Sequence, residues 1–457
     1  MDWKKTYEKW LEFVELDEQL RVHLEKVEDV MELEDRFYKH LEFGTGGMRG
    51  VIGPGTNRMN KYTVRKAAAG LAHYIVDAGD ETKARGVVIA YDSRHQSAEF
   101  AMEAAKTLGY EGIQVYLFES LRTTPELSFA VRFLHAYAGI VITASHNPAA
   151  YNGFKVYGSD GAQFASSDAD VIVENVEAVV NELTVPVADE ATLKEQGMLS
   201  MIGETVDNAY HAQLEKIIIN EAAINQATDD FKIVYTPLHG TGRVPVMRGL
   251  RDIGFTQVDI VDEQALPDPD FSTVEFPNPE ESAAFSLAME YGKKSGADLL
   301  LATDPDADRV GVAVKNGAGY MLLTGNQIGA ILLHYIVTQK SLQGRLPQNG
   351  AVLKTIVTSE LGRDIASAYD LTTIDTLTGF KYISEKTKEF ETTGSHEFSL
   401  GYEESYGYLI GDFVRDKDAV QTCVLIAEAA AFYHTKSMTL YDALQEIFAR
   451  YDTTRKI

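Results

Sequence analysis

Short apolar runs alternate with amphipathic stretches along this 457-residue chain, and this alternation limits the fold more than any other feature. In the N-terminal part we predict strands at the apolar runs 86–91, 113–118 and 138–143. We predict helices at the stretches with one apolar face, which are 64–78, 99–108 and 125–134. Buried strands that alternate with amphipathic helices are typical of βαβ units and a mostly parallel sheet.

The same alternation returns twice further along the chain. Apolar runs recur at 231–235, 258–261 and 298–302, and then at 351–357 and 371–376. We therefore predict an α/β protein with three consecutive three-layer α/β/α domains, whose mixed sheets are mostly parallel. The expected domain boundaries are 43–206, 207–319 and 320–457, after an N-terminal helical extension over 1–42.

The N-terminal extension is predicted to be helical over 3–40. Trp3, Tyr7, Trp10 and Val14 recur at the spacing of one helical face, and the positions between them are mostly acidic. This pattern is typical of a docking helix whose acidic face lies in solvent.

Charge and cysteine content narrow the class of partner. The 42 Lys and Arg against 68 Asp and Glu give a formal net charge of −26, which argues against nucleic acid and anionic membranes. With Cys423 as its one cysteine, no signal-like apolar core near the start and no run of membrane-spanning length, we expect a cytoplasmic protein. We expect a monomer or weak dimer that binds a small molecule.

The first candidate loop is Thr143–Pro148, which follows the predicted strand 138–143. Ligands in such sheets lie beyond the carboxyl ends of strands, so Ser145 is placed to act as a nucleophile. Adjacent residues seldom form a nucleophile–base pair, and we expect His146 to shape the pocket or to bind substrate. A plain polar turn is the alternative.

The second loop, Asp304–Arg309, carries the strongest chemical signal. Asp304, Asp306 and Asp308 occupy alternate positions, which would point the same way on an extended segment. Three carboxylates together repel one another unless a cation neutralises them, and hard oxygen ligands favour Mg²⁺ or Ca²⁺. The glycine spacer of an EF-hand loop is missing, which favours a magnesium site. A solvated acidic turn is the alternative.

Four further segments give weaker indications of a binding site. The Gly401–Tyr408 segment combines acids, a hydroxyl and glycines, a set suited to sugar hydroxyls but also to an ordinary turn. Basic residues lie near glycines or in short polar turns at Phe43–Gly50, Asp92–Arg94 and Asn152–Lys155, where they could gather a local positive charge for an anion.

In combination these motifs resemble those of the α-D-phosphohexomutase superfamily. The matching segments are FGTGGMRG, TASHNP, DPDADR and GYEES, in this order, within a resemblance that runs from about residue 40 to about residue 450. The pattern is most similar to the phosphoglucomutase/phosphomannomutase branch with phosphopentomutase-like members. The resemblance implies a phosphoserine at Ser145 and Mg²⁺ bound by the three aspartates and by that phosphoserine. It also implies glucose 1,6-bisphosphate as activator.

The resemblance also implies roles for further residues. Arg49 matches the loop arginine near the phosphoserine, and Lys155 matches the candidate general acid/base of the family, with His146 beside the phosphoserine. The positions that match substrate-binding motifs are Arg309, Thr378, Gly379, Glu403, Ser405 and Lys417.

One family feature has no counterpart in this sequence. Family members have a fourth, C-terminal domain with an Arg-x-Ser-Gly-Thr-type loop that clamps the non-reacting phosphate. We therefore expect this chain to lack that domain, and its mutase activity to be impaired, because remote contacts hold a reactant in place.

The resemblance implies interconversion of glucose 1-phosphate and glucose 6-phosphate. Mannose or pentose phosphates of the same family remain alternatives, as does a non-catalytic fragment that only binds a sugar phosphate. A metal-dependent phosphatase with an aspartate nucleophile is a third alternative, but it leaves the TASHNP loop without a role.

Overall fold

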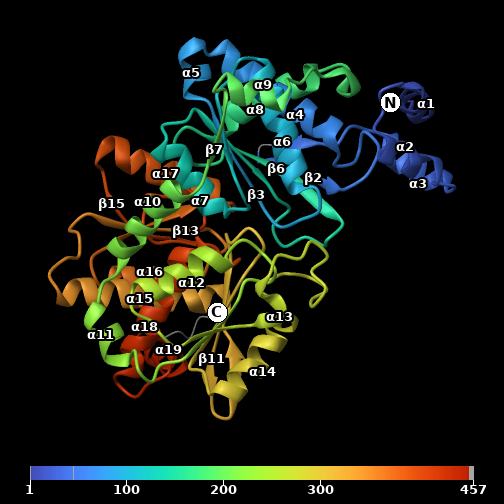
Figure 1. Ribbon diagram of the computed structural model, residues 1–457. Coiled ribbons are helices and arrows are strands. Elements are labelled where there is room, and N and C mark those ends of the chain that lie inside the picture. The colour runs from blue at the N-terminus through green and yellow to red at the C-terminus, as the bar shows by residue number, and fades with distance from the viewer. Residues whose placement is uncertain (1, 45, 452–457) are drawn as a thin grey trace. The chain divides into compact units, whose positions relative to one another are not determined.

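The computed structural model describes residues 2–44 and 46–451 of the chain (Figure 1). It contains two compact units. The first comprises Met1–Arg122 and Ala130–Gly203, and the second comprises Thr123–Phe129 and Glu204–Ile457.

Three short helices open the first unit, where the sequence predicted one long helix. They are α1 (Trp3–Glu12), α2 (Glu18–Glu25) and α3 (Val30–Phe37). Asp17 and Asp29 cap the second and third helices by accepting backbone N–H groups, which explains the interruptions. Val14 lies between helices and is 91% exposed, so its assignment to the buried face was wrong. Trp10 is buried, and its indole donates a hydrogen bond of 2.8 Å to Glu182.

A seven-stranded mixed sheet forms the centre of the first unit. Its strands in spatial order are β1 (Phe43–Gly44), β2 (Gly47–Val51), β6 (Tyr151–Gly158), β5 (Ala138–Ile142), β3 (Val87–Tyr91), β4 (Val115–Phe118) and β7 (Leu199–Ile202). The pairings of β3 with β4 and β5, and of β4 with β7, are parallel. The antiparallel strand β6 joins β5 to β2, and this places the loop after β5 beside two further strands.

Helices of the first unit pack on this sheet through apolar faces. They are α4 (Lys61–Asp77), α6 (Ser97–Tyr110), α8 (Ser166–Ala178) and α9 (Glu190–Glu195). The short helix α5 (Asp80–Arg85), which buries no residue, and a 3₁₀ turn η1 (Glu182–Thr184) complete this set. Ala68, Leu71 and Ile75 of α4 are fully buried in the same core as Ile89 and Ile140 of the sheet. Burial of this apolar area is the main stabilising contribution to such a domain.

The second unit contains two sheets. The first has five strands in the order β12 (Gly319–Leu322), β11 (Val310–Asn316), β10 (Leu299–Thr303), β8 (Ile233–Thr236) and β9 (Val258–Ile260). Strands β10, β8 and β9 run parallel, and β11 returns antiparallel to β10. The associated helices are α10 (Glu204–Leu214), α11 (Glu221–Ala227), α12 (Arg243–Asp252), α13 (Asp262–Ala265) and α14 (Ser286–Ser295), with 3₁₀ turns η2 (Glu215–Ile217) and η3 (Ser282–Phe285).

The second sheet of this unit has four strands. Their order is β14 (Thr372–Thr376), β13 (Gly350–Thr355), β15 (Glu397–Tyr402) and β16 (Tyr408–Leu409). Only the β15–β16 pairing in it is antiparallel. The helices that follow or connect these strands are α15 (Gly325–Leu342), α16 (Leu361–Ser367), α17 (Phe380–Thr393), α18 (Ala419–His434) and α19 (Leu440–Arg450). The first turns of α7 (Thr124–Phe133) also belong to this unit.

The α/β prediction with mixed sheets is confirmed. Seven of the thirteen strand pairings among the described residues are parallel. In residues 2–44 and 46–451, no helix has both the length and the apolar character needed to span a bilayer.

Candidate active site

The Ser145 loop follows β5, as the sequence predicted. Ser145 is 4% exposed, and its backbone N–H donates to the Thr143 hydroxyl at 2.8 Å. Its φ is +52°, in the left-handed region that a residue other than glycine enters at a cost of about 1–3 kcal/mol, most often at functional sites. The chain therefore turns sharply at this residue.

This turn brings Ser145 and His146 together. The Ser145 Oγ lies 3.2 Å from His146 Nδ1, within hydrogen-bond distance. We expected adjacent residues not to pair in this way, because an ordinary extended backbone directs successive side chains apart. The left-handed φ at Ser145 removes that obstacle, and the close pair makes His146 a candidate proton partner for the serine.

Arg94 stabilises the Ser145 loop through hydrogen bonds to its backbone. Its buried guanidinium donates to the backbone carbonyls of Ser145 and Asn147, and to Pro148 at 2.8 Å and Tyr151 at 3.1 Å. Its Nε also lies 3.3 Å from a carboxylate oxygen of Asp92. Our expectation that the Asp92–Arg94 segment offers charge to an anion was therefore wrong for Arg94, whose guanidinium is occupied by backbone carbonyls and Asp92.

The strands on either side contribute the other predicted residues of this unit. Arg49 of β2 is exposed, and it donates a 2.7 Å hydrogen bond to the side-chain carbonyl of Asn147 in the Ser145 loop. Lys155 of β6 lies opposite Val141 of β5 and is 9% exposed. Gly153 allows the close approach of β6, because a Cβ there would lie 2.5 Å from the Thr143 carbonyl oxygen.

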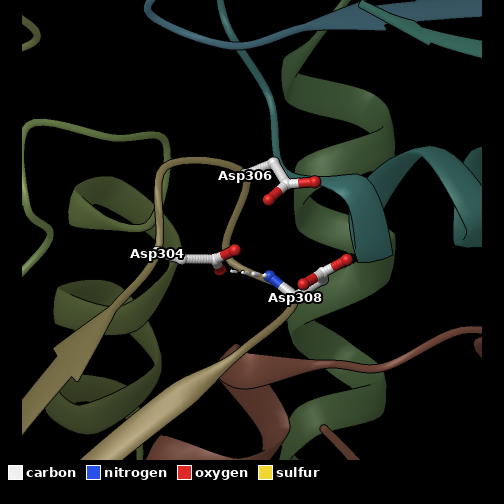
Figure 2. A group of neighbouring side chains, drawn as sticks. All are labelled: Asp304, Asp306 and Asp308. Carbon is white, nitrogen blue, oxygen red and sulfur yellow. Dashed lines mark hydrogen bonds between the residues drawn. The ribbon is translucent and has the colours of Figure 1, made fainter. Parts of the chain in front are cut away.

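In the second unit, Asp304, Asp306 and Asp308 converge after β10 (Figure 2). One carboxylate oxygen of each lies within 4.8 Å of the others, and the three residues are at most 2% exposed. The convergence was predicted, but the extended backbone that we expected was wrong. The segment is a tight turn in which the Ala307 N–H donates to the Asp304 carbonyl at 2.9 Å, and Ala307 has a φ of +54°.

Hydrogen bonds within the turn fix Asp304. Its Oδ1 accepts the backbone N–H groups of Asp308 at 3.0 Å and Arg309 at 2.9 Å, and Figure 2 shows the first of these bonds. The carboxylate is thus oriented before any ligand binds, which is typical of a pre-organised site.

Thr124 is a site residue that sequence reasoning missed. It begins α7, and its hydroxyl donates to Asp306 Oδ2 at 2.8 Å, while its backbone N–H donates to the Asp306 carbonyl at 2.9 Å. The two residues are 182 positions apart, and a threonine at a helix start carries no sign of such a partner. The TTPE sequence around it predicts a helix start and nothing further.

Lys417 lies beside the cluster of three aspartates. Lys417 Nζ lies 3.2 Å from Asp308 Oδ2 and 3.4 Å from Asp416 Oδ1. Burial alone would lower the pKa of Lys417, but the carboxylates of Asp308, Asp416 and Glu403 raise it well above its ordinary value. The side chain therefore stays an ammonium and partly balances the acidic residues.

Glu403 and Gly379 also meet in this unit. The Gly379 N–H donates to Glu403 Oε1 at 3.1 Å. Burial raises the pKa of the Glu403 carboxyl above its ordinary value, while Lys417 and this backbone N–H oppose the shift. Two predicted substrate-binding positions are thus brought together beside Lys417.

Three other predicted positions are placed less centrally. The Arg309 guanidinium forms an ion pair with Glu280, and its Nε is 4.0 Å from Asp308 Oδ1. Thr378 is exposed, and Ser405 is half-buried in the turn between β15 and β16. Thr378 and Ser405 are thus at least partly open to solvent, whereas the Arg309 guanidinium is held by Glu280.

The donor set fits a hard divalent cation. Three buried carboxylates repel one another, and oxygen ligands on a pre-oriented turn are what Mg²⁺ accepts, with further positions left for water or phosphate oxygens. Asp304, Asp306 and Asp308 would hold the ion.

Two bacterial proteins are similar to most of this chain. A phosphoglucomutase of Staphylococcus haemolyticus (strain JCSC1435) is 42% identical over 417 residues, which are 91% of this chain and 73% of that protein. A phosphoglucomutase of Staphylococcus aureus (strain N315) is 40% identical over 445 residues, which are 96% of this chain and 77% of that protein. The chain belongs to the phosphoglucomutase/phosphomannomutase family.

The family's domain models place the site residues. The models described as phosphoglucomutase/phosphomannomutase alpha/beta/alpha domains I, II and III match residues 40–182, 208–317 and 324–451. Ser145 thus lies in domain I, the three aspartates lie in domain II, and Glu403 and Lys417 lie in domain III.

A solved member of the family shows the same fold. The structure of pp63/parafusin, a phosphoglucomutase from Paramecium in its open form, matches with a TM-score of 0.71 at 17% identity. The match covers 91% of this chain and 75% of that one. At this identity the likeness concerns the fold alone.

Proposed function

We propose that this chain interconverts glucose 1-phosphate and glucose 6-phosphate, as an intramolecular phosphotransferase of the isomerase class. The observation that carries the proposal is the buried convergence of Asp304, Asp306 and Asp308, in a chain that is 40–42% identical to phosphoglucomutases over most of its length.

Ser145 is proposed to carry the phosphoryl group. The bond between phosphorus and Ser145 Oγ breaks as a sugar hydroxyl oxygen attacks, and the sugar becomes a bisphosphate. The hydroxyl proton passes to a base and a proton is returned to Ser145 Oγ, and Lys155 and His146 are the candidates for these transfers. The other phosphoryl group of the bisphosphate then returns to Ser145, and a proton restores the sugar hydroxyl.

Magnesium bound by the three aspartates and by an oxygen of phosphorylated Ser145 would neutralise charge on the transferring phosphoryl group. Glucose 1,6-bisphosphate is the proposed activator, because it can phosphorylate an unmodified Ser145. Arg49 is proposed to bind phosphate near the serine.

The remaining predicted residues are proposed to bind the sugar phosphate. They are Arg309, Thr378, Gly379, Glu403, Ser405 and Lys417. Glu403 and Lys417 support this role best, because a buried acid and a fixed ammonium can hydrogen-bond the hydroxyls on one face of a sugar.

Three properties of the whole chain are part of the same proposal. We propose a cytoplasmic enzyme, in keeping with its single, buried cysteine, and a monomer or weak dimer. We also propose the domain ranges 43–206, 207–319 and 320–457. The impaired turnover expected from the sequence stays a prediction.

Intact mass and a coupled assay test the function. We expect mass spectrometry to place one phosphate on Ser145 after incubation with glucose 1,6-bisphosphate. We also expect the chain to form glucose 6-phosphate from glucose 1-phosphate with Mg²⁺. Mannose 1-phosphate and ribose 1-phosphate, assayed in parallel, decide between substrates of the family.

Two outcomes would contradict the proposal. Phosphate trapped on an aspartate, together with release of inorganic phosphate, would identify a phosphatase. Saturable binding of glucose 1-phosphate with neither turnover nor phosphorylation of Ser145 would identify a non-catalytic binding protein.

A further inference from the structure

A pocket of about 420 Å³ lies in the second unit, between the segment after α10 and the start of β15. Its volume lies within the range of small-molecule sites. Its walls are Gln213, Lys216, Ile217, Ile218, Ile219, Ile336, Lys340, Arg345, Phe398, Ile410, Gly411, Asp412 and Phe413. None of the residues proposed for the phosphotransfer is among them.

The pocket lies at the opposite end of two elements from the sugar-binding positions. Phe398 is at the start of β15 and Glu403 directly follows its end, a separation of roughly 16 Å along a strand. Helix α15 begins beside the Gly401–Tyr408 segment, where Tyr408 donates to the Gly325 carbonyl, and its last turn reaches the pocket with Lys340. Its 18 residues span roughly 27 Å.

Three cationic side chains gather at this pocket in a chain of net charge −26. Arg345 donates to the Ile219 carbonyl at 3.3 Å, which directs its guanidinium over the pocket, and Lys216 donates to Gln213 at 3.1 Å. The Lys340 ammonium makes no hydrogen bond or ion pair with any described residue. Together they form a cationic rim, with the acids Asp412 on the wall and Glu397 near Lys340.

The charged groups around Lys340 are Arg345 and Glu397. Burial, and then the charge of Arg345, lower the pKa of Lys340, while Glu397 opposes the shift. Asp412 is the acid on the wall, and its carboxylate lies 3.9 Å from Arg415. A bound anion would relieve the repulsion between the two cations, and this favours an anionic ligand.

The pocket has a partly apolar lining. Ile336 and Ile219 are buried at its floor, at 1% and 7% exposure, and Phe398, Ile410 and Phe413 are half-buried around them. A sugar phosphate offers hydroxyls to such walls, and these would lose their hydrogen bonds to water. An apolar part of the wall beside a cationic rim suits a ligand that carries an acidic group on an aromatic or short aliphatic body.

We propose that this pocket binds a small organic anion, with its apolar body against Ile219, Ile336 and Phe398 and its acidic group at Lys340 and Arg345. This site is independent of the phosphotransfer proposed above, so a negative result for one proposal does not contradict the other.

Two fluorescent probes that differ by one charge test the proposal. We expect 8-anilinonaphthalene-1-sulfonate to bind the full chain saturably at one site. We expect Lys340→Met and Arg345→Gln each to weaken this binding about tenfold. The uncharged N-phenyl-1-naphthylamine has the same apolar body, and its affinity should change less than twofold in these variants.

Lys293→Met is the matched control, since Lys293 is also in the last turn of a helix but outside the pocket. It should bind both probes as the parent chain does. The proposal is overturned if the sulfonate does not bind saturably or binds the variants as it binds the parent. It is also overturned if both probes weaken equally, which would indicate an apolar patch without anion recognition. Arg345 is exposed, so its variant should fold even if the Lys340 variant does not.

Discussion

At the scale of single residues, both candidate loops depend on one non-glycine residue in the left-handed region. Ser145 has a φ of +52° and Ala307 a φ of +54°. Such conformations are sparsely populated and persist where surrounding contacts enforce them, here Arg94 at the first loop and Thr124 at the second. The strain fixes the direction in which a reactive group points.

Replacement of Ser145 separates its chemistry from its conformation. Ser145→Ala and Ser145→Gly should both lose phosphotransfer by at least about a thousandfold in the coupled assay. Glycine tolerates a positive φ, whereas alanine does not, so the glycine variant should be the more stable by about 1 kcal/mol in urea unfolding. Residual turnover near the parent level in both variants would remove Ser145 from the mechanism.

Gly407 is required by the position of Lys417. A Cβ at Gly407 would lie 2.2 Å from Lys417 Cδ, so Gly407→Ala must displace the lysine. We expect kcat to fall about tenfold or more, with a loss of about 1–3 kcal/mol of stability from overpacking. Gly319→Ala is the control, because nothing lies within 4 Å of its Cβ position. Equal activity of the two variants would show that Lys417 is not needed where it lies.

At the scale of elements, the sequence was sufficient for the apolar strands before the two candidate loops, but it did not predict strands such as β6 and β11. The run before Asp304 and the run before Thr143 were both predicted within two residues of β10 and β5. Such runs are recognised because buried parallel strands are almost uniformly apolar. The break between α1 and α2 was missed, although Asp17 is a typical N-cap and could have indicated it.

Contacts between residues far apart in the chain could not be predicted from the sequence. The bond from Thr124 to Asp306, and the four carbonyls around Arg94, depend on how distant segments pack. A periodicity within one segment carries no information about such contacts. For the same reason the Asp92–Arg94 segment was interpreted as one of the segments that gather positive charge for an anion.

The Thr124 hydroxyl at the start of α7 should strengthen Mg²⁺ binding by the turn after β10. Thr124→Val removes the hydroxyl that orients Asp306, and loss of such a supporting bond typically weakens metal binding about 10- to 100-fold. Titration calorimetry with Mg²⁺ measures this directly. Thr124→Ser keeps the hydroxyl and should bind as the parent does. If the valine variant binds Mg²⁺ normally, the aspartates are oriented by the turn alone.

At the scale of the whole molecule, acid should destabilise the fold through a buried histidine. Burial, and then the charge of Arg248, lower the pKa of His211 from 6.5 to about 4. Between these values the unfolded chain binds a proton that the folded chain does not, so stability falls as pH falls from about 6.5 to about 4. The loss from this group is on the order of 3 kcal/mol.

Urea unfolding at pH 7 and pH 5 measures the first part of this loss, about 2 kcal/mol. His211→Phe keeps a ring at this site but cannot ionise, so its stability should depend less on pH than that of the parent chain. His73→Gln serves as the control, because His73 is exposed. A parent-like pH dependence in the phenylalanine variant would assign the acid sensitivity to other groups.

The assignment of residues 123–129 to the second unit has a consequence for recombination. Thr124 belongs to the second unit, but it precedes the rest of that unit in the chain. A fragment that starts after residue 203 therefore lacks the threonine that contacts Asp306. A chimera that exchanged only 204–457 with a relative would pair an imported aspartate turn with a native threonine. Chimeras within this family should therefore keep this contact when residues 123–129 and 204–457 are exchanged together.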